Sequence, residues 1–239
     1  MVLARQISLE QLSAVDPDRE CFIIKSVIAP PICRAIIKFL DHFSSLAAPN
    51  ESCGGENWWY DVSDRGNSFR SYMFYELGQV GSPDLLETYR TIFNLYRHFG
   101  EASELGEFDQ LISDSSFTTN YRTINPLVFS YSCGTSNFGW HRHDARNQRF
   151  QLLLNVTAPN RDYRGGETLV YMGDGRPELA DDGYVCFGEE FSLGDIFSFP
   201  YDRWHKVNPT RQAGGAGKRV SVLMPLAARN NPEYRNEYL

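Results

Sequence analysis

The stretch GDIFSFPYDRWH, residues 194–205, combines a glycine–aspartate turn, a short apolar run and a histidine. A run of four apolar or small residues bounded by turn signals is typical of a buried strand. His205 follows this predicted strand closely, so we expect it at the rim of a sheet, where a side chain can meet a ligand.

The same pattern of short apolar runs between turn residues continues on both sides of this stretch, from about residue 120 onward. Short runs rich in β-branched and aromatic residues are separated by Gly, Pro, Asn and Asp, and no internal repeat is present. The runs cover residues 127–132, 150–156, 168–172, 196–199 and 220–223. This pattern predicts a mainly β fold of sandwich or jelly-roll type.

The N-terminal half carries helical signals instead. Apolar residues recur at helical spacing after Pro30 and Pro31, and again between Ser82, a favourable N-cap, and Gly100, a favourable terminator. Both stripes predict amphipathic helices that pack under a sheet. The aromatic segment 57–75 has two open interpretations, which are a strand pair on the core and a substrate lid or pocket wall.

Size, charge and cysteine usage limit the class of protein. The 239 residues suffice for one well-cored domain, and the net charge of -7 disfavours nucleic acid and anionic membranes as partners. The five cysteines are odd in number and form no C-x-x-C pair, which argues against a disulfide framework. No signal peptide or membrane span is evident, so we expect a cytoplasmic protein.

The segment WHRHD, residues 140–144, holds two of the five histidines of the chain. Residues i and i+2 of a strand point to the same side, so His141 and His143 can reach one metal ion, and His205 can join them from another strand. Imidazole is the commonest protein ligand of divalent transition metals. These histidines therefore predict a mononuclear metal site with open positions, suited to redox chemistry.

Four motifs occur in the same order as in a known family. They are Tyr131-Ser132-Cys133-Gly134 before His141, then Gly165-Gly166-Glu167-Thr168, then His205-Lys206-Val207, then Arg219-Val220-Ser221. On these motifs the chain resembles the Fe(II)- and 2-oxoglutarate-dependent dioxygenase superfamily, in its prolyl-hydroxylase-like branch. The resemblance covers about residues 120–226.

The resemblance implies a double-stranded β-helix, or jelly roll, within a single domain of residues 1–239. Residues 1–119 would supply N-terminal support and a possible substrate lid, residues 120–228 the jelly-roll core, and residues 229–239 a polar tail. It also implies Fe(II), with 2-oxoglutarate and O2 as cosubstrates, and hydroxylation of an unactivated carbon of a small molecule, such as an amino acid or a biosynthetic intermediate.

The same resemblance assigns residues to the site. His141 and His205 would bind iron, Arg219 and Ser221 would hold the distal carboxylate of 2-oxoglutarate, and Tyr131 and Asn155 would lie near the cosubstrate. The arginine fork suits a carboxylate, and a buried arginine requires an anion. The candidates for contact with the substrate are Arg146, Arg149, Arg203 and Trp140.

The first metal motif departs from the family pattern of His-x-Asp or His-x-Glu, because His143 stands where the carboxylate belongs and Asp144 comes one position later. Two sites are possible, one with three histidines and one in which a local bulge turns Asp144 inward. Strand alternation favours His143.

Three other functions stay open at this point. One is a cupin-like metal-binding module or sensor without 2-oxoglutarate turnover. Another is a radical halogenase, although His143 is larger than the small residue expected there. The third is a zinc hydrolase, which is disfavoured because the sequence places no evident general base and leaves Arg219 without a role.

Overall fold

The side chains of strand β15 (Lys218–Leu223) alternate between two environments. Val220 and Val222 pack into the main apolar core against the helices, whereas the buried Arg219 and Ser221 point to the opposite face. This alternation follows from the two-residue period of a strand. One sheet face is thereby assigned to the helices, and the other face to a polar site.

The computed structural model describes residues 2–46, 57–64, 67–74, 77–101, 103, 105–113, 124, 126–134, 136–143, 148–226 and 237–238. The remaining strands are β1 (Val2–Leu3), β2 (Arg5–Ile7), β3 (Phe22–Ile24), β4 (Trp58–Val62), β5 (Phe69–Met73), β6 (Leu127–Ser132), β7 (Phe138–Arg142), β8 (Phe150–Asn155), β9 (Tyr163–Gly165), β10 (Thr168–Tyr171), β11 (Tyr184–Phe187), β12 (Ile196–Pro200), β13 (Trp204–Val207), β14 (Thr210–Gln212) and β16 (Glu237–Tyr238). The helices are α1 (Pro30–Leu46), α2 (Pro83–His98) and α3 (Phe108–Ser113), with 3-10 turns at Leu9–Ala14, Leu77–Gln79 and Pro177–Leu179.

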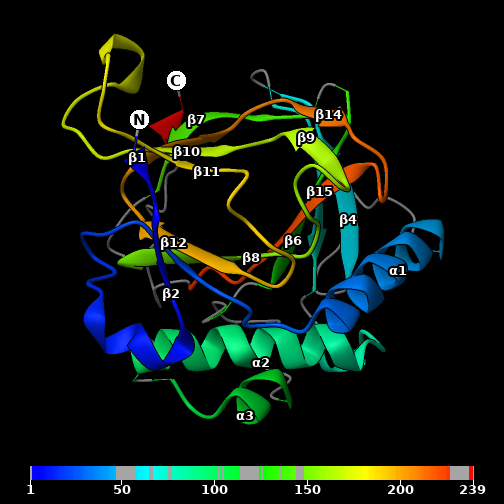
Figure 1. Cartoon of the computed structure of the whole chain (residues 1–239). Coiled ribbons are helices and arrows are strands. Elements are labelled where there is room, and N and C mark those ends of the chain that lie inside the picture. The colour runs from blue at the N-terminus through cyan, green and yellow to red at the C-terminus, as the bar shows by residue number, and fades with distance from the viewer. Residues whose placement is uncertain are drawn as a thin grey trace.

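Two sheets face each other in Figure 1, and the chain passes back and forth between them. The larger sheet has the order β2-β3-β12-β8-β15-β6-β5-β4, and the smaller one β1-β11-β10-β13-β7-β16. From β6 onward, strands β6, β8, β12 and β15 lie in the larger sheet, and β7, β10, β11 and β13 in the smaller. This is a double-stranded β-helix, so the predicted fold class is confirmed.

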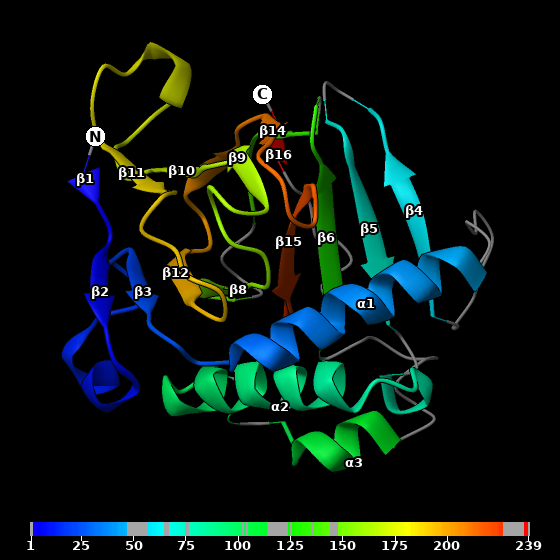
Figure 2. The same cartoon turned by 45° about the vertical axis from the view of Figure 1, so that its right-hand side comes forward.

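Helices α1 and α2 lie together below the strands, as Figures 1 and 2 both show. The buried face of α2, which includes Tyr89 and Ile92, joins the same apolar core as Val128 and Leu152 of the larger sheet. The predicted cap of α2 is present, because the Ser82 hydroxyl accepts from the backbone N–H of Leu85 at 3.3 Å. The helices thus close one face of the sheet and leave the jelly-roll interior for the site.

The segments outside the jelly roll extend its sheets. Strands β4 and β5 continue the larger sheet beyond β6, so the aromatic segment forms the predicted strand pair in its described part (Figure 2). At the two edges of the smaller sheet lie β1 and β16, which come from the two ends of the described chain. The end of the predicted polar tail therefore includes a short strand paired with β7.

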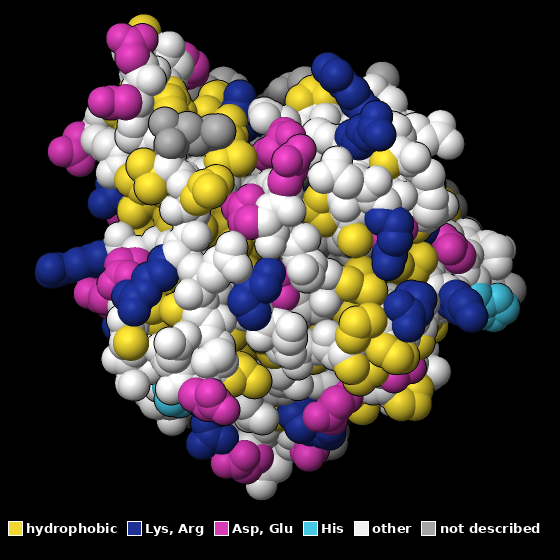
Figure 3. Space-filling model, viewed as in Figure 1, with side chains coloured by type: hydrophobic (Ala, Val, Ile, Leu, Met, Phe, Trp, Pro, Cys, Tyr) yellow, Lys and Arg dark blue, Asp and Glu magenta, His cyan; other side chains and the backbone are white. Residues whose placement is uncertain are grey.

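The surface mixes both signs of charge. In Figure 3, acidic and basic side chains are interspersed along the lower edge, over the helices. Among the described residues, no helix combines the length and apolar character needed to cross a membrane. The described cysteines Cys21, Cys33, Cys133 and Cys186 are all free thiols.

Candidate metal centre and carboxylate recess

Three histidines from two neighbouring strands converge in the jelly-roll interior. His205 of β13 pairs directly with His141 of β7, and His143 lies just beyond the end of β7. One ring nitrogen of each histidine lies within 4.8 Å of those of the other two. The structure therefore brings together the three histidines that the sequence predicted as a cluster.

Two of these imidazoles are oriented by backbone carbonyls. The Nδ1 of His141 lies 2.9 Å from the carbonyl oxygen of Gly139, and the Nδ1 of His205 lies 2.8 Å from that of Arg203. A carbonyl only accepts, so Nδ1 carries the proton in both rings and Nε2 keeps its lone pair. Such a second partner fixes both the tautomer and the ring orientation of a metal ligand.

Burial keeps these rings in the neutral form that binds metal. His141 is 2% exposed, and burial together with the nearby His205 and His143 lowers its pKa well below the usual 6.5. Burial, followed by the charge of His143, lowers the pKa of His205 to about 3. Desolvation of an imidazolium causes both shifts. Imidazole in this neutral form suits iron, zinc, copper or nickel.

Arg219 lies buried beside this cluster and is only 2% exposed. Its Nη2 donates to the Thr168 hydroxyl at 2.8 Å, and its guanidinium lies 5.2 Å from the ring centre of Tyr131. Thr168 stands two residues before Val170, which pairs with His205. Two residues of strand span about 7 Å, so Arg219 and the histidines lie within the reach of a short dicarboxylate.

Several polar atoms beside Arg219 have no hydrogen-bond partner among the described residues. They are Nη1 of Arg219, Oγ of Ser221, and both amide atoms of Asn155; the Tyr163 hydroxyl lies beside Arg219 and Asn155 but does not reach these atoms in good hydrogen-bond geometry. Ser221 pairs with Asn155 across β15 and β8, so these groups lie together, and we call this polar cluster the recess. Unsatisfied buried polar groups are costly, and a cation surrounded by neutral donors is suited to an anion. The residues present therefore fit a bound carboxylate.

The turn between β9 and β10 packs against the same arginine. Gly165 and Gly166 have φ values of +66° and +67°, which glycine adopts without strain. A Cβ on Gly166 would lie 2.7 Å from Thr210 and 3.3 Å from Cδ of Arg219. The paired glycines thus have a structural role, which is to let the turn approach Arg219.

The structure places the other predicted residues differently. Trp140 lies on the outer face of the smaller sheet, because it contacts Lys206, which stands between the inward-facing His205 and Val207 of β13. Its ring lies 4.9 Å from the Lys206 ammonium and 5.9 Å from the Tyr184 ring. Trp140 is therefore separated from the histidines by the sheet, and its contact with substrate stays a prediction.

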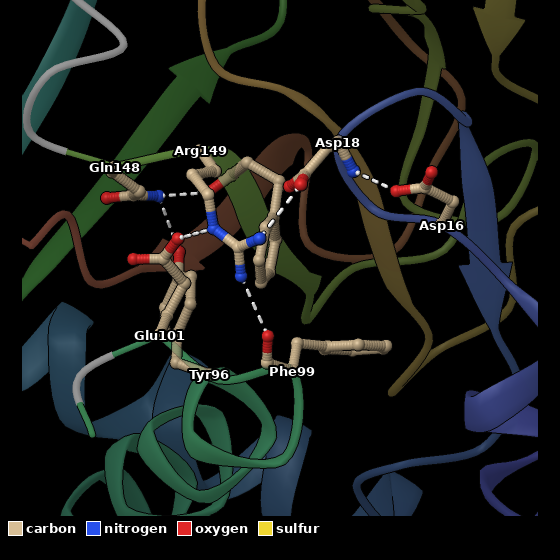
Figure 4. Close-up of polar contacts among 8 residues, drawn as sticks. Asp16, Asp18, Tyr96, Phe99, Glu101, Gln148 and Arg149 are labelled. Atoms are coloured by element: carbon tan, nitrogen blue, oxygen red, sulfur yellow. Dashed lines mark hydrogen bonds and ion pairs between the residues drawn. The ribbon is translucent and has the colours of Figure 1, made fainter.

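Arg149 has polar partners of its own, as Figure 4 shows. Its guanidinium pairs with Asp18 at 2.8 Å, pairs with Glu101, and donates to the carbonyl oxygen of Phe99 at 2.8 Å. These contacts give Arg149 a structural role as an anchor, and its contact with substrate stays a prediction.

Arg203 lies in the turn before His205, and its carbonyl oxygen accepts the hydrogen bond from Nδ1 of His205. Its Nη1 donates to the carbonyls of Met172 and Gly173, each at 3.4 Å. Asp144 and Arg146 lie outside the described residues, so the structure does not place these two predicted residues.

Three further residues of the site were not predicted from the sequence. Thr168 was noted only as part of a turn motif, Tyr163 contacts the recess beside Gly166, and Tyr201 stacks on His143 with ring centres 4.5 Å apart. Burial raises the pKa of Tyr163, and the charge of Arg219 opposes this. A tyrosine or threonine in an apolar run is ordinary core composition, so only the fold reveals these contacts.

Comparisons with known proteins agree with this geometry at the level of the fold. No protein-family model and no curated protein sequence matches the chain. Among solved structures, the chain is similar to the non-haem α-ketoglutarate-dependent epimerase SnoN from nogalamycin biosynthesis, with a TM-score of 0.54 and 11% identity over 94% of this chain and 87% of that one.

It is also similar to a prolyl hydroxylase from Trichoplax adhaerens, solved with a hypoxia inducible factor peptide. That match has a TM-score of 0.51 and 10% identity, and it covers 91% of this chain and 86% of that one. At such identities the likeness concerns the fold. The chain thus has the double-stranded β-helix fold found in 2-oxoglutarate-dependent oxygenases, including a prolyl hydroxylase, as its sequence motifs indicated.

Proposed function

We propose that the protein is a non-haem Fe(II)- and 2-oxoglutarate-dependent oxygenase that oxidises, by default hydroxylates, an unactivated carbon of a small molecule. The proposal rests on the proximity of two features, a cluster of histidines and a buried arginine. Three imidazoles converge next to a buried arginine whose Nη1 makes no hydrogen bond to a described residue. A metal-binding module alone has no need for that arginine.

In this proposal, His141, His205 and His143 hold the metal ion. The carbonyl oxygens of Gly139 and Arg203 keep the Nδ1 protons of His141 and His205 in place, so both rings present Nε2. The metal, when bound, would supply activation of O2 coupled to oxidative decarboxylation of 2-oxoglutarate. Asp144 is the alternative third ligand.

The recess binds the other end of the cosubstrate. Arg219 and Ser221 donate to its distal carboxylate, and Thr168 holds Arg219 in position through Nη2. Asn155, opposite Ser221, adds an amide donor. Because these groups are buried, the ion pair with the carboxylate forms in a medium of low dielectric, where it is strongest.

The remaining assignments complete the proposal. Residues 1–239 act as one domain, Fe(II), 2-oxoglutarate and O2 are its cofactor and cosubstrates, and a small molecule is its substrate. The net charge of -7 supports the exclusion of nucleic acid. The second candidate is a cupin-like metal-binding module, which the three-histidine set favours.

An anaerobic titration separates these candidates. The Fe(II)-loaded protein receives 2-oxoglutarate while the visible metal-to-ligand charge-transfer band is recorded, in wild type and in His143→Ala and Asp144→Ala. We expect the band in wild type and in Asp144→Ala, and its loss in His143→Ala. Succinate release in air is measured in parallel. A wild-type protein that binds Fe(II) but shows neither band nor succinate would support the metal-binding module.

A further inference from the structure

We propose that Tyr201 is a positioning residue that holds His143 in place as the third metal ligand. This inference rests on the proposed function, because it concerns the same metal centre. It follows from one ring contact and from the way the turn that carries Tyr201 is fixed.

The contact is close and nearly parallel. The rings of Tyr201 and His143 have centroids 4.5 Å apart and an interplanar angle of 22°. Tyr201 is 1% exposed, so its ring has little freedom to move. An aromatic face against an imidazole restricts the tilt of that imidazole and thus the direction of its nitrogen lone pairs.

His143 differs from the other two histidines in its backbone setting. His141 and His205 pair with each other inside the strand ladder. The described register of β7 ends at Arg142, one residue before His143. The ladder therefore sets the direction of two imidazoles, and the third packs against the ring of Tyr201.

The turn that carries Tyr201 serves two histidines at once. It joins β12 to β13 through residues 201–203, and the carbonyl oxygen of Arg203 meets Nδ1 of His205 at 2.8 Å. The backbone N–H of Arg203 donates to the carbonyl oxygen of Pro200 at 3.2 Å, which tightens the turn. A single turn thus orients His205 through a carbonyl and His143 through a ring.

The base of this turn is anchored by the network in Figure 4. The backbone N–H of Tyr201 donates to the carbonyl oxygen of Arg149 at 2.9 Å. The Arg149 guanidinium is in turn held by Asp18, Glu101 and the Phe99 carbonyl. Tyr201 is therefore fixed at its backbone and buried at its ring, as a positioning residue must be.

Titration of the metal-free protein with Co(II) alone tests this role. The readouts are the Co(II) affinity and the visible ligand-field spectrum, so no turnover is needed. We expect Tyr201→Leu to raise the Kd for Co(II) about tenfold, which is the usual size for loss of a residue that orients a ligand. Tyr201→Phe, which keeps the ring, should stay near wild type in both readouts.

Tyr89→Leu is the matched control, because Tyr89 is a fully buried tyrosine of α2 in the helix-facing core. It should lower thermal stability without changing the Co(II) affinity or spectrum. Where Tyr201→Leu does not fold, Tyr201→Met replaces it, since methionine keeps most of the apolar volume.

A double-mutant cycle with His143→Ala gives the sharpest outcome. If Tyr201 acts through His143, then Tyr201→Leu should have no further effect on the Co(II) affinity once His143 is gone. Additive losses of Co(II) affinity in the double variant would overturn the inference. An unchanged Kd for Co(II) in either His143→Ala or Tyr201→Leu would also overturn it. So would a loss of affinity in Tyr201→Phe as large as that in Tyr201→Leu. A wild-type protein that binds no Co(II) would instead overturn the proposed function.

Discussion

Arg219 is the residue whose burial most needs a partner. A guanidinium that is 2% exposed, with one nitrogen on Thr168 and another without a protein partner among the described residues, is stabilised when a carboxylate binds. At the scale of single residues, the recess is therefore defined by unsatisfied hydrogen bonds rather than by its shape.

Replacing Arg219 by Gln should weaken 2-oxoglutarate binding at least about 30-fold, because loss of one partner of a buried charge pair costs about 2–5 kcal/mol. The affinity of the Fe(II)-loaded protein for 2-oxoglutarate is measured by anaerobic titration. Arg211→Gln, at an exposed arginine of β14, is the control. Equal affinity in Arg219→Gln and wild type would remove Arg219 from the cosubstrate site.

At the scale of elements, the turn between β9 and β10 adapts the sheet to the recess. Gly166 approaches Arg219 so closely that a side chain has no room. Gly217 makes a useful comparison, because its φ of +64° is nearly the same and a Cβ there would meet nothing within 4 Å.

Gly217→Ala should therefore show only the strain of a left-handed backbone, about 1–2 kcal/mol in the free energy of unfolding. Gly166→Ala should lose about 1–3 kcal/mol more through the steric clash and should also weaken 2-oxoglutarate binding. Urea unfolding and the anaerobic titration measure the two effects. Identical losses in both variants would show that the close approach has no energetic consequence.

A second feature at the scale of elements is the set of contacts by which Arg149, just before β8, joins Asp18 of the N-terminal segment to Phe99 and Glu101, just after α2. Arg149 makes three contacts there, although its side chain is 46% exposed and solvent screens the two ion pairs. We expect Arg149→Gln to lower the free energy of unfolding by about 1 kcal/mol.

The control for this anchor is Arg97→Gln, which removes one ion pair with the exposed Glu107. That variant should lose less stability than Arg149→Gln in the same urea series. The opposite order would show that the Arg149 contacts do not join the three elements energetically.

At the scale of the whole molecule, the buried histidines link metal binding to stability. Their pKa values lie below the unfolded value of about 6.5, to about 3 for His205. Between these two pH values the unfolded chain binds protons that the native protein does not. The stability of the metal-free protein therefore falls as the pH falls below about 6.5.

We expect each of His141 and His205 to contribute about 2 kcal/mol of destabilisation between pH 7 and pH 5 in the metal-free protein. Urea unfolding at both pH values measures this, and His205→Gln should reduce the difference. His42→Gln, at an exposed position of α1, should leave it unchanged. A pH-independent stability of the wild type would contradict the burial of neutral imidazoles.

The sequence by itself determined the periodic features and the local motifs. Apolar runs bounded by turn residues predicted strands β6, β8, β10, β12 and β15, and Ser82 predicted the start of α2, because both signals depend on neighbours close in the chain. The spacing of His141 and His143, together with the family resemblance that assigned His205 and Arg219, predicted the histidine cluster. The carboxylate-binding role of Arg219 stays a prediction.

Only the tertiary structure decided which side chains from distant parts of the chain come into contact. The pairing of β13 with β7 brings His205 to His141, the turn before β13 brings Tyr201 to His143, and the segment after α2 brings the Phe99 carbonyl to Arg149. These contacts join residues far apart in the sequence. Their physical reason is sheet register and packing, which set the direction of each side chain and which no local pattern encodes.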